Sequence, residues 1–120
     1  KIIGKKRKSL AKQYDKNFNG VKNIKFVNQN YDEVLPHIYP IFFKTSKLRN
    51  KIKHALFQSN IETGLHYKPN HLLKFFKTKF QLNLSESTYK RILTLPLHID
   101  LKIKDVNRIC EIIKSNIPKN

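Results

Sequence analysis

Residues 61–72 read IETGLHYKPNHL and indicate more about this chain than any other segment. Residues 61–67 place alternating apolar side chains before a His-Tyr pair, a pattern that favours a β-strand ending in polar rings. Pro69 interrupts the pattern, and Asn70 is a good N-cap for a short helix over residues 71–79. Because binding groups collect in loops at the ends of strands, this segment predicts a site as well as a strand.

The N-terminal segment predicts one long amphipathic helix. Residues 1–18 carry apolar side chains at spacings of three or four residues, or their multiples, which places on one helical face Ile3, Leu10, Tyr14 and Phe18. Asn19-Gly20 ends the helix, because both residue types tolerate the left-handed conformation of a helix C-terminus.

Two strands and a second helix are predicted next. Residues 24–27 and 37–44 are rich in β-branched and aromatic residues, and Pro40 indicates an edge or a bulge near the beginning of the second strand. Ser46 is a suitable N-cap for a helix that runs to Ser59 and presents one apolar face of Leu48, Ile52 and Leu56.

The C-terminal third predicts two further helices. Ser85 or Ser87 caps a helix that ends near Leu93, and residues 94–99 are extended. The last helix spans residues 102–116, where one apolar stripe contains Ile103, Val106, Cys110, Ile113 and Ile117.

Together these elements predict an α+β domain over residues 1–120, with a small mixed or antiparallel three-stranded sheet and helices on one face. The chain begins with Lys1 rather than Met, which suggests a processed or partial chain. No segment reaches the about 20 apolar residues of a membrane span, so we expect no membrane association. The single cysteine, Cys110, is expected to be a buried thiol in a reducing compartment.

The net charge of +17 suggests an alternative class, a small basic module that binds nucleic acid or another polyanion. Lysine greatly outnumbers arginine, although arginine is the better reader of phosphates and bases. The lysines occur in nearly every segment and are expected to form no single stripe. We therefore interpret the charge as a solvated basic surface and expect no specific nucleic-acid binding.

Four segments carry a resemblance that covers nearly the whole chain. NIETGLHYKPNHL at residues 60–72 is followed by RILTLPLH at 91–98 and KDVNRI at 104–109, and is preceded by the basic helix from Lys6 to Tyr14. In this order they resemble the motifs of the DegT/DnrJ/EryC1/StrS sugar aminotransferases. These are pyridoxal-phosphate enzymes that aminate keto-sugar nucleotides.

The resemblance implies the C-terminal small domain of a fold-type I aminotransferase, with residues 1–19 as the helix that joins it to a large domain. The family's cofactor lysine lies in an H-x-x-K segment of that large domain, which is expected to be absent here. His71 and Lys74 have the same spacing, but they fall within the small-domain motif, so Lys74 is expected to be a solvated helix residue. The chain alone is therefore expected to bind no cofactor, to supply no catalytic residue and to be inactive.

For the parent enzyme, the resemblance implies transfer of an amino group from glutamate to a keto-sugar nucleotide. The product would be a precursor of surface polysaccharide or lipopolysaccharide. The resemblance also implies a cytoplasmic homodimer with pyridoxal phosphate as its cofactor.

The same resemblance places His66, Tyr67 and His71 beside the substrate sugar. Imidazole and phenol groups can hydrogen-bond sugar hydroxyls while their rings pack on the pyranose. Two alternatives stay open: one of the first two rings faces the core, because strand neighbours point to opposite sides, or His71 only bonds nearby backbone. A zinc site on the two histidines is disfavoured, since neither a cysteine nor a carboxylate lies between them.

The remaining polar candidates indicate structural roles. His37 and His98 flank apolar strands and are expected to be edge or core histidines with hydrogen-bond partners. His54 lies on a lysine-rich helical face and is expected to be exposed. Glu62 has no second carboxylate nearby in sequence, so it does not suggest a general acid/base pair.

Overall fold

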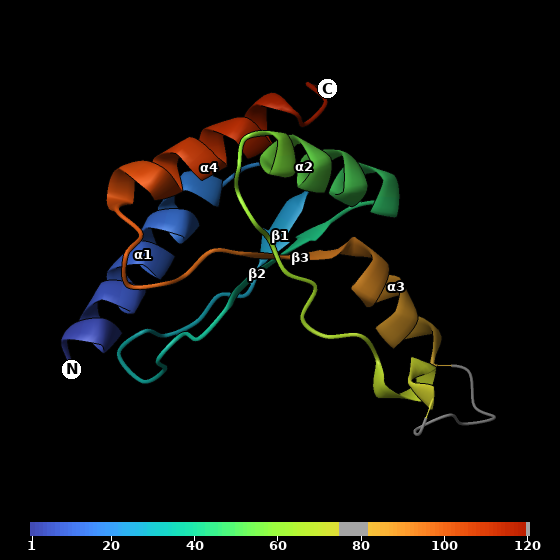
Figure 1. Ribbon diagram of the computed structural model, residues 1–120, viewed down its shortest axis with the longest axis horizontal. Helices are drawn as coiled ribbons and strands as arrows, with labels where there is room; N and C mark the ends of the chain where they lie inside the picture. Colours follow the sequence, from blue (N-terminus) through green and yellow to red (C-terminus); the bar gives the residue numbers. More distant parts are fainter. Residues whose placement is uncertain (75–81, 120) are drawn as a thin grey trace.

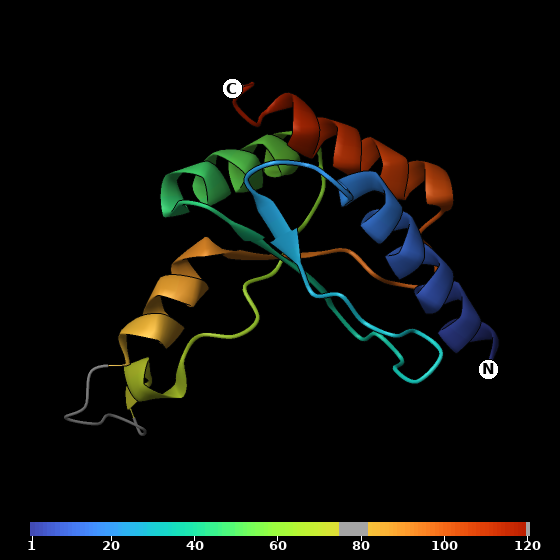
Figure 2. The same cartoon turned by 180° about the vertical axis from the view of Figure 1, so that it is seen from behind.

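Three antiparallel strands form the sheet of this computed structural model, which describes residues 1–74 and 82–119. The strand order is β1 (Ile24–Phe26), β2 (Tyr39–Phe43) and β3 (Ile92–Leu95). Figures 1 and 2 show the helices gathered on one side of this sheet, with a short 3-10 turn and one helix projecting beyond it. The helical elements are α1 (Ile2–Phe18), α2 (Ser46–Gln58), η1 (Asn70–Leu72), α3 (Asn83–Arg91) and α4 (Ile103–Ser115). The predicted α+β class with a three-stranded antiparallel sheet is confirmed.

The central strand, β2, tolerates a proline because of where its hydrogen bonds go. Strand β1 pairs only with Ile41, Phe42 and Phe43, so it does not reach Pro40. On the other side Pro40 lies opposite Thr94, whose backbone N–H and C=O both pair with Gly64 instead. The missing N–H of the proline therefore leaves no ladder hydrogen bond unmade. The predicted edge near the beginning of this strand is confirmed in this form.

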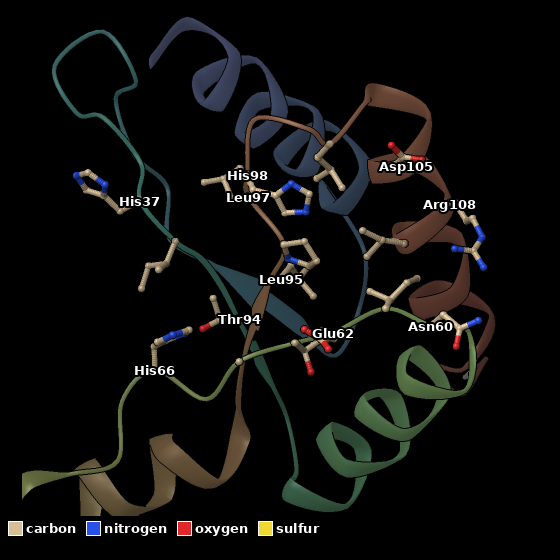
Figure 3. Close-up of a pocket in the computed structure, with 17 residues that line it drawn as sticks. His37, Asn60, Glu62, His66, Thr94, Leu95, Leu97, His98, Asp105 and Arg108 are labelled. Atoms are coloured by element: carbon tan, nitrogen blue, oxygen red, sulfur yellow. The ribbon is translucent and has the colours of Figure 1, made fainter. Parts of the chain in front are cut away.

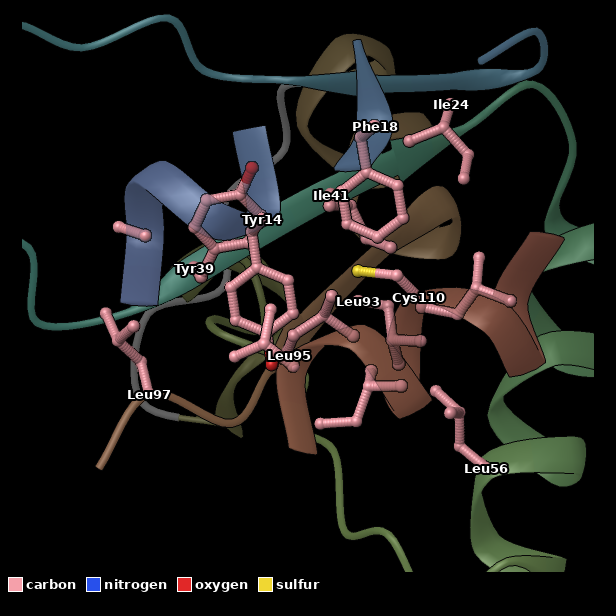
Figure 4. Close-up of a cluster of buried hydrophobic side chains, with 14 of the residues drawn as sticks. Tyr14, Phe18, Ile24, Tyr39, Ile41, Leu56, Leu93, Leu95, Leu97 and Cys110 are labelled. Carbon is pink, nitrogen blue, oxygen red and sulfur yellow. The ribbon is translucent and has the colours of Figure 1, made fainter. Parts of the chain in front are cut away.

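The core lies between the sheet and helices α1, α2 and α4. Alternate residues of β2, Tyr39, Ile41 and Phe43, are buried because they face these helices. Figure 4 shows the Tyr14 and Phe18 rings of α1 packed in this cluster, and the Tyr14 and Tyr39 ring centroids lie 4.5 Å apart. The aromatic packing fixes α1 against the sheet.

Buried hydroxyl groups in this core have partners. The Tyr14 hydroxyl donates to the Pro96 carbonyl at 2.9 Å, and the Tyr39 hydroxyl donates to Asp15 Oδ1 at 2.6 Å. Burial, followed by the nearby Asp15 carboxylate, raises the pKa of Tyr39 above its usual range. The hydroxyl groups of these two core tyrosines are therefore buried with hydrogen-bond partners.

The first and last helices pack along each other. Asn107 Oδ1 on α4 accepts from Gln13 Nε2 and Asn17 Nδ2 on α1, each at 2.9 Å. Next to these amides, Cys110 is only 1% exposed, and burial raises the pKa of its thiol to about 11. The predicted buried thiol is confirmed. Its neighbours in the core on α4 are Val106, Ile109 and Ile113.

The predicted strand over residues 61–67 is wrong. Within this segment only Gly64 pairs, in an isolated bridge with Thr94, and the third strand is β3 instead. All four residues of β3 are buried, whereas Glu62 and Tyr67 are exposed. Burial beside β2 stabilises the fold more when the buried segment is the continuous apolar run of β3 than it would with the half-polar segment over residues 61–67.

The first two helices agree with prediction in their extent but differ in detail. Ile3 is 51% exposed rather than buried, because it lies in the first turn of α1, before the helix reaches the core. Thr45, not Ser46, is the N-cap of α2, and its Oγ1 accepts from the Leu48 N–H at 3.1 Å. The predicted extent of the last helix is confirmed within one residue at each end.

The predicted caps of the third helix are wrong, because α3 begins two residues earlier than Ser85, with Leu82 at the N-cap position. The helix predicted over residues 71–79 begins as the 3-10 turn η1, and residues 75–79 lie outside the described residues. None of the helices in residues 1–74 and 82–119 combines the length and apolar character that a membrane crossing requires.

Candidate functional site

The segment from Ile61 to His66 lies along the outer edge of β3. The Gly64 N–H donates to the Thr94 carbonyl at 2.9 Å, and the Thr94 N–H donates back to the Gly64 carbonyl at 2.8 Å. This single reciprocal pair holds the segment in place without extending it into a strand. We call the segment over residues 61–73, together with the outer side of β3, the β3 edge.

Gly64 has a packing role in the β3 edge. A Cβ atom at this position would overlap Cε1 of the His66 ring and stand 2.7 Å from its Nδ1. The imidazole therefore folds back over the glycine, a position that no residue with a side chain would leave open. This contact gives a physical reason for the Thr-Gly-x-His spacing.

A hollow with a volume of about 780 Å³ lies between residues 60–66, residues 94–98 and the beginning of α4. We call it the central cleft. Figure 3 shows polar groups of both charge signs around it. Its titratable side chains are His37, Glu62, His66, His98, Asp105 and Arg108.

The polar groups at the α4 end of the central cleft already have partners. Asp105 Oδ2 accepts from the Lys102 N–H at 2.8 Å, which caps α4. Arg108 NH2 donates to the Ser59 carbonyl at 3.2 Å. At the other end, Thr94 Oγ1 and His66 Nδ1 are buried and have no hydrogen-bond partner. The two ends therefore differ in what they can offer to a ligand.

A second hollow of about 520 Å³ brings together the three predicted site residues, His66, Tyr67 and His71. The His66 and Tyr67 rings meet edge to face, with centroids 4.8 Å apart. Tyr67 is 74% exposed and His66 is half-buried, so neither ring belongs to the core. We call this the side hollow, and it is also lined by Leu82, Leu84, Thr88, Tyr89 and Ile92.

His71 has a partner that the sequence did not reveal. Its Nε2 lies 3.5 Å from Glu86 Oε1 in the first turn of α3, close enough for charge attraction to a protonated imidazole, but the buried Nε2 makes no hydrogen bond within the described residues. The pair joins η1 to a helix fifteen positions later. Glu86 has no motif around it, so only the fold could identify it as part of the site.

The other histidines divide between confirmed and wrong predictions. His54 is exposed on α2, as predicted. His37 is exposed, with Nδ1 at 3.3 Å from Arg7 NH1, so it is an edge histidine with a partner. His98, like His37, is exposed and lines the central cleft, so it is not a core histidine, and no hydrogen-bond partner of its ring is found within the described residues. The reason is that β3 ends at Leu95, before the chain reaches this residue.

The lysines are partly organised, contrary to prediction. Intervals of three, four and four residues place four of them along one side of α1, where they line a shallow trough: Lys5, Lys8, Lys12 and Lys16. The interleaved basic residues of the same helix conceal this stripe in the sequence. Across residues 1–74 and 82–119, no three side chains of His, Cys, Asp or Glu converge into a group that could hold a metal ion.

Comparison with known proteins identifies the class. The sequence model of the DegT/DnrJ/EryC1/StrS aminotransferase family matches residues 1–114, so the chain belongs to this family. The resemblance of the four motif segments is thereby confirmed.

One relative and one solved structure show how similar the chain is to individual family members. The chain is 28% identical to the UDP-4-amino-4,6-dideoxy-N-acetyl-beta-L-altrosamine transaminase of Campylobacter jejuni, an alignment that covers 95% of this chain and 32% of the relative. Among solved structures, the candidate sugar aminotransferase Spr1654 of Streptococcus pneumoniae, in its PLP form, has a TM-score of 0.83 at 27% identity. That alignment covers 95% of this chain and 31% of the other.

A more distant structure shares the fold. PseC of Helicobacter pylori, an aminotransferase involved in the biosynthesis of pseudaminic acid, has a TM-score of 0.77 at 22% identity. The alignment covers 95% of this chain and 32% of the PseC chain. The chain thus spans about a third of the length of the relatives that it matches.

Proposed function

We propose that this chain is the small domain of a pyridoxal-phosphate-dependent aminotransferase that acts on a keto-sugar nucleotide. Residues 1–120 would form that single domain, and residues 1–19 the helix that joins it to a large cofactor-binding domain. The family membership and the coverage of about a third of each relative support this division. The Campylobacter jejuni relative, named for a UDP-linked amino sugar, supports the nucleotide-sugar class.

The observation that carries the proposal is the meeting of His66, Tyr67 and His71 in the side hollow. The two imidazoles and the phenol offer donors and acceptors to sugar hydroxyls, while their ring faces can pack on a pyranose. Leucine side chains beside them, Leu82 and Leu84, add apolar surface that a sugar ring can cover. This combination of a few polar groups with an apolar wall is typical of small-molecule sites.

The residues of this chain do not fit the cofactor. A lysine that acts as an amine nucleophile needs desolvation or a cationic neighbour. Every lysine within residues 1–74 and 82–119 is at least partly exposed, including Lys74, which follows His71 at the H-x-x-K spacing. Pyridoxal phosphate, which acts as an electron sink when bound, would be held by the large domain. Titration of this chain with the cofactor, followed by borohydride and mass analysis, should yield no stoichiometric lysine adduct.

The finer features of the proposal concern the parent enzyme. We infer glutamate as the amino donor, a homodimer in the cytoplasm, and a product used for surface polysaccharide or lipopolysaccharide. This chain would contribute substrate contacts and no catalytic residue, and it would be inactive alone. Neither a membrane nor a specific nucleic acid is part of the proposed function.

The test uses a full-length enzyme that carries this domain and separates its two half-reactions by single-turnover kinetics. The variants His66→Ala, Tyr67→Phe and His71→Ala should slow the keto-sugar half-reaction about ten- to a hundredfold, because each removes one hydrogen bond to the sugar. The amino-donor half-reaction should stay nearly intact.

His54→Ala is the matched control, since His54 is an exposed histidine on α2, outside the side hollow. It should leave both half-reactions unchanged. Equal losses in both half-reactions for the three site variants, or thermal melts that fall in step with activity, would show that these residues are scaffold.

A further inference from the structure

Three buried polar atoms at the β3 edge have no hydrogen-bond partner in the described residues. One is His71 Nε2, and the other two, Thr94 Oγ1 and His66 Nδ1, belong to residues that line the central cleft. Buried hydroxyl and imidazole groups normally find partners, because an unpaired buried polar atom lowers stability. Thr94 is only 5% exposed, and its side chain belongs to the wall of the central cleft. The fold thus keeps a buried hydroxyl that contributes no hydrogen bond to it.

Gly64 links the two groups. Its backbone pairs with that of Thr94, and the His66 ring folds back over its α-carbon. Both residues line the central cleft, and Figure 3 draws their side chains toward the same end of it. Rotation of about 120° around χ1 exchanges the hydroxyl and the methyl of a threonine, so Thr94 can turn its hydroxyl toward a ligand without backbone movement.

We propose that Thr94 and His66 form a binding pair for a hydroxyl group of a pyranose in the central cleft. The proposal rests on the proposed function for the choice of a sugar as ligand, and it adds Thr94 as a specificity-determining residue. A ligand hydroxyl both donates and accepts, so it can pair with the threonine hydroxyl and with either tautomer of the imidazole.

The charges around the cleft favour a neutral polyol over an anion at this end. A carboxylate or phosphate can only accept hydrogen bonds, and the Glu62 carboxylate lines the same cleft with like charge. Among the described residues, the one arginine of the cleft lining, Arg108, lies at the α4 end and already donates to the Ser59 carbonyl. The volume of about 780 Å³ lies within the range of small-molecule sites, about 300–1,000 Å³. Apolar lining residues, among them Pro96 and Leu97, offer surface to the C–H faces of a sugar ring.

The first experiment measures the stability of this chain without ligand. Thr94→Val keeps the shape of the side chain and removes the unpartnered hydroxyl, so its melting temperature should rise above that of the wild type. Thr94→Ser keeps the hydroxyl and removes a buried methyl, so its melting temperature should fall. A melting temperature for Thr94→Val that is equal to or below the wild-type value would overturn the proposal, because the hydroxyl would then have a partner within the fold.

The second experiment measures binding by NMR titration with N-acetylglucosamine, UDP-N-acetylglucosamine and UDP. Both sugars should shift the amide resonances of Gly64, His66 and Leu95 in the wild type and in Thr94→Ser, whereas UDP should not. Thr94→Val should bind the sugars at least about tenfold more weakly, because one hydrogen bond is lost. Equal affinities of the wild type and Thr94→Val, or no shift with either sugar, would overturn the proposal.

The two sugar probes also separate this inference from the proposed function. Thr94-dependent binding of N-acetylglucosamine, to which the nucleotide adds no affinity, would keep the hydroxyl site and argue against the nucleotide-sugar function. Binding of UDP-N-acetylglucosamine that shifts Tyr67 and His71 but ignores Thr94→Val would keep the function and overturn this inference.

Discussion

The helix-covered face of the sheet and the β3 edge differ in how completely their side chains are buried and their polar groups are hydrogen-bonded. On the covered face Ile41 and Leu93 are fully buried, and the tyrosine hydroxyls find a carbonyl or a carboxylate. At the β3 edge one reciprocal backbone pair joins the segment to β3, three buried polar atoms of the described residues make no hydrogen bond, and Tyr67 is exposed.

The difference separates what stabilises this domain from what it offers to a ligand. Closed packing with satisfied hydroxyls contributes most of the stability. A few polar groups held at an open edge contribute little stability but remain available for binding. Substitutions on the two sides should therefore act on different measurements.

Truncation in the covered face should have the largest effect. Leu93→Ala removes a fully buried side chain at the centre of the core and should cost about 2–5 kcal/mol of unfolding free energy. Leu84→Ala, at a leucine that is 79% exposed beside the side hollow, should change it by less than about 0.5 kcal/mol. Urea unfolding of both variants measures the contrast. Similar losses would mean that the side hollow belongs to the core.

Alkaline pH should also act on the covered face. Because burial raises the pKa of Cys110 from 9.0 to about 11, its contribution to stability is complete below the unfolded pKa and is lost as pH rises through the folded one. The unfolding free energy should fall by about 2–3 kcal/mol between these values, as the buried thiol is forced to ionise.

The matched variant for this pH effect is Cys110→Ala, which has no group to titrate at that position. Its unfolding free energy should show less decline between pH 9.0 and about 11 than that of the wild type. Burial raises the pKa values of Tyr14 and Tyr39 well above 10.0, so their ionisation in the unfolded chain lowers the unfolding free energy of both proteins alike at higher pH. Parallel declines in the two proteins would show that the thiol is not responsible.

Glycine substitutions in the two regions should change stability by smaller amounts. Gly64→Ala should push the His66 ring away while changing stability little, because the ring is the free end of a side chain. In Gly4→Ala, in α1, the added Cβ meets only the two flexible methyl groups of Leu35, at 3.3 and 3.9 Å, and the variant should stabilise the helix by about 0.5–1 kcal/mol. NMR of the His66 ring protons and thermal melts distinguish the two outcomes. An undisturbed imidazole in Gly64→Ala would refute the packing role of the glycine.

The covered face was the more predictable of the two from sequence. Three- and four-residue spacings identified Leu10, Tyr14 and Phe18 on α1, and the same reasoning identified the buried stripe that includes Cys110 on α4. Such periodicity reports burial directly, because one helical face must point inward. The third strand was missed because an apolar run such as Ile92–Leu95 fits a helix end as well as a strand.

The β3 edge was predictable only in part. The motif resemblance named His66, Tyr67 and His71, and the structure brings them to one hollow. Glu86 and Thr94 could not be inferred, since their relation to these rings depends on long-range packing of α3 and β3. A buried atom without a partner has no sequence signal at all.

Lysine substitutions on α1 should have the smallest effect on stability. We expect any DNA binding to be weak, non-specific and lost steeply with salt, with the stripe as its main contact. Glutamine at all four stripe positions should leave the thermal melt unchanged and reduce the slope of log K against log salt by about 3–4. The substituted residues are Lys5, Lys8, Lys12 and Lys16.

A control of equal charge change shows whether location matters. The control should reduce the slope of log K against log salt less. It replaces with glutamine four exposed lysines outside α1: Lys22, Lys25, Lys47 and Lys51. Equal effects of the two variants would mean that net charge alone attracts DNA. Submicromolar, sequence-selective binding that survives about 0.2 M salt would instead support the polyanion-binding alternative.

The packing of the late helix α4 on the early strand β2 has a consequence for synthesis. Tyr39, Ile41 and Phe43 leave the ribosome well before Ile113, the last core residue of α4, which follows Phe43 by 113 − 43 = 70 positions. At roughly 5–20 residues per second, about 4–14 s pass between the addition of Phe43 and the addition of Ile113. During that interval the side chains of β2 that face α4 lack this cover, so the core closes only after Ile113 has been added.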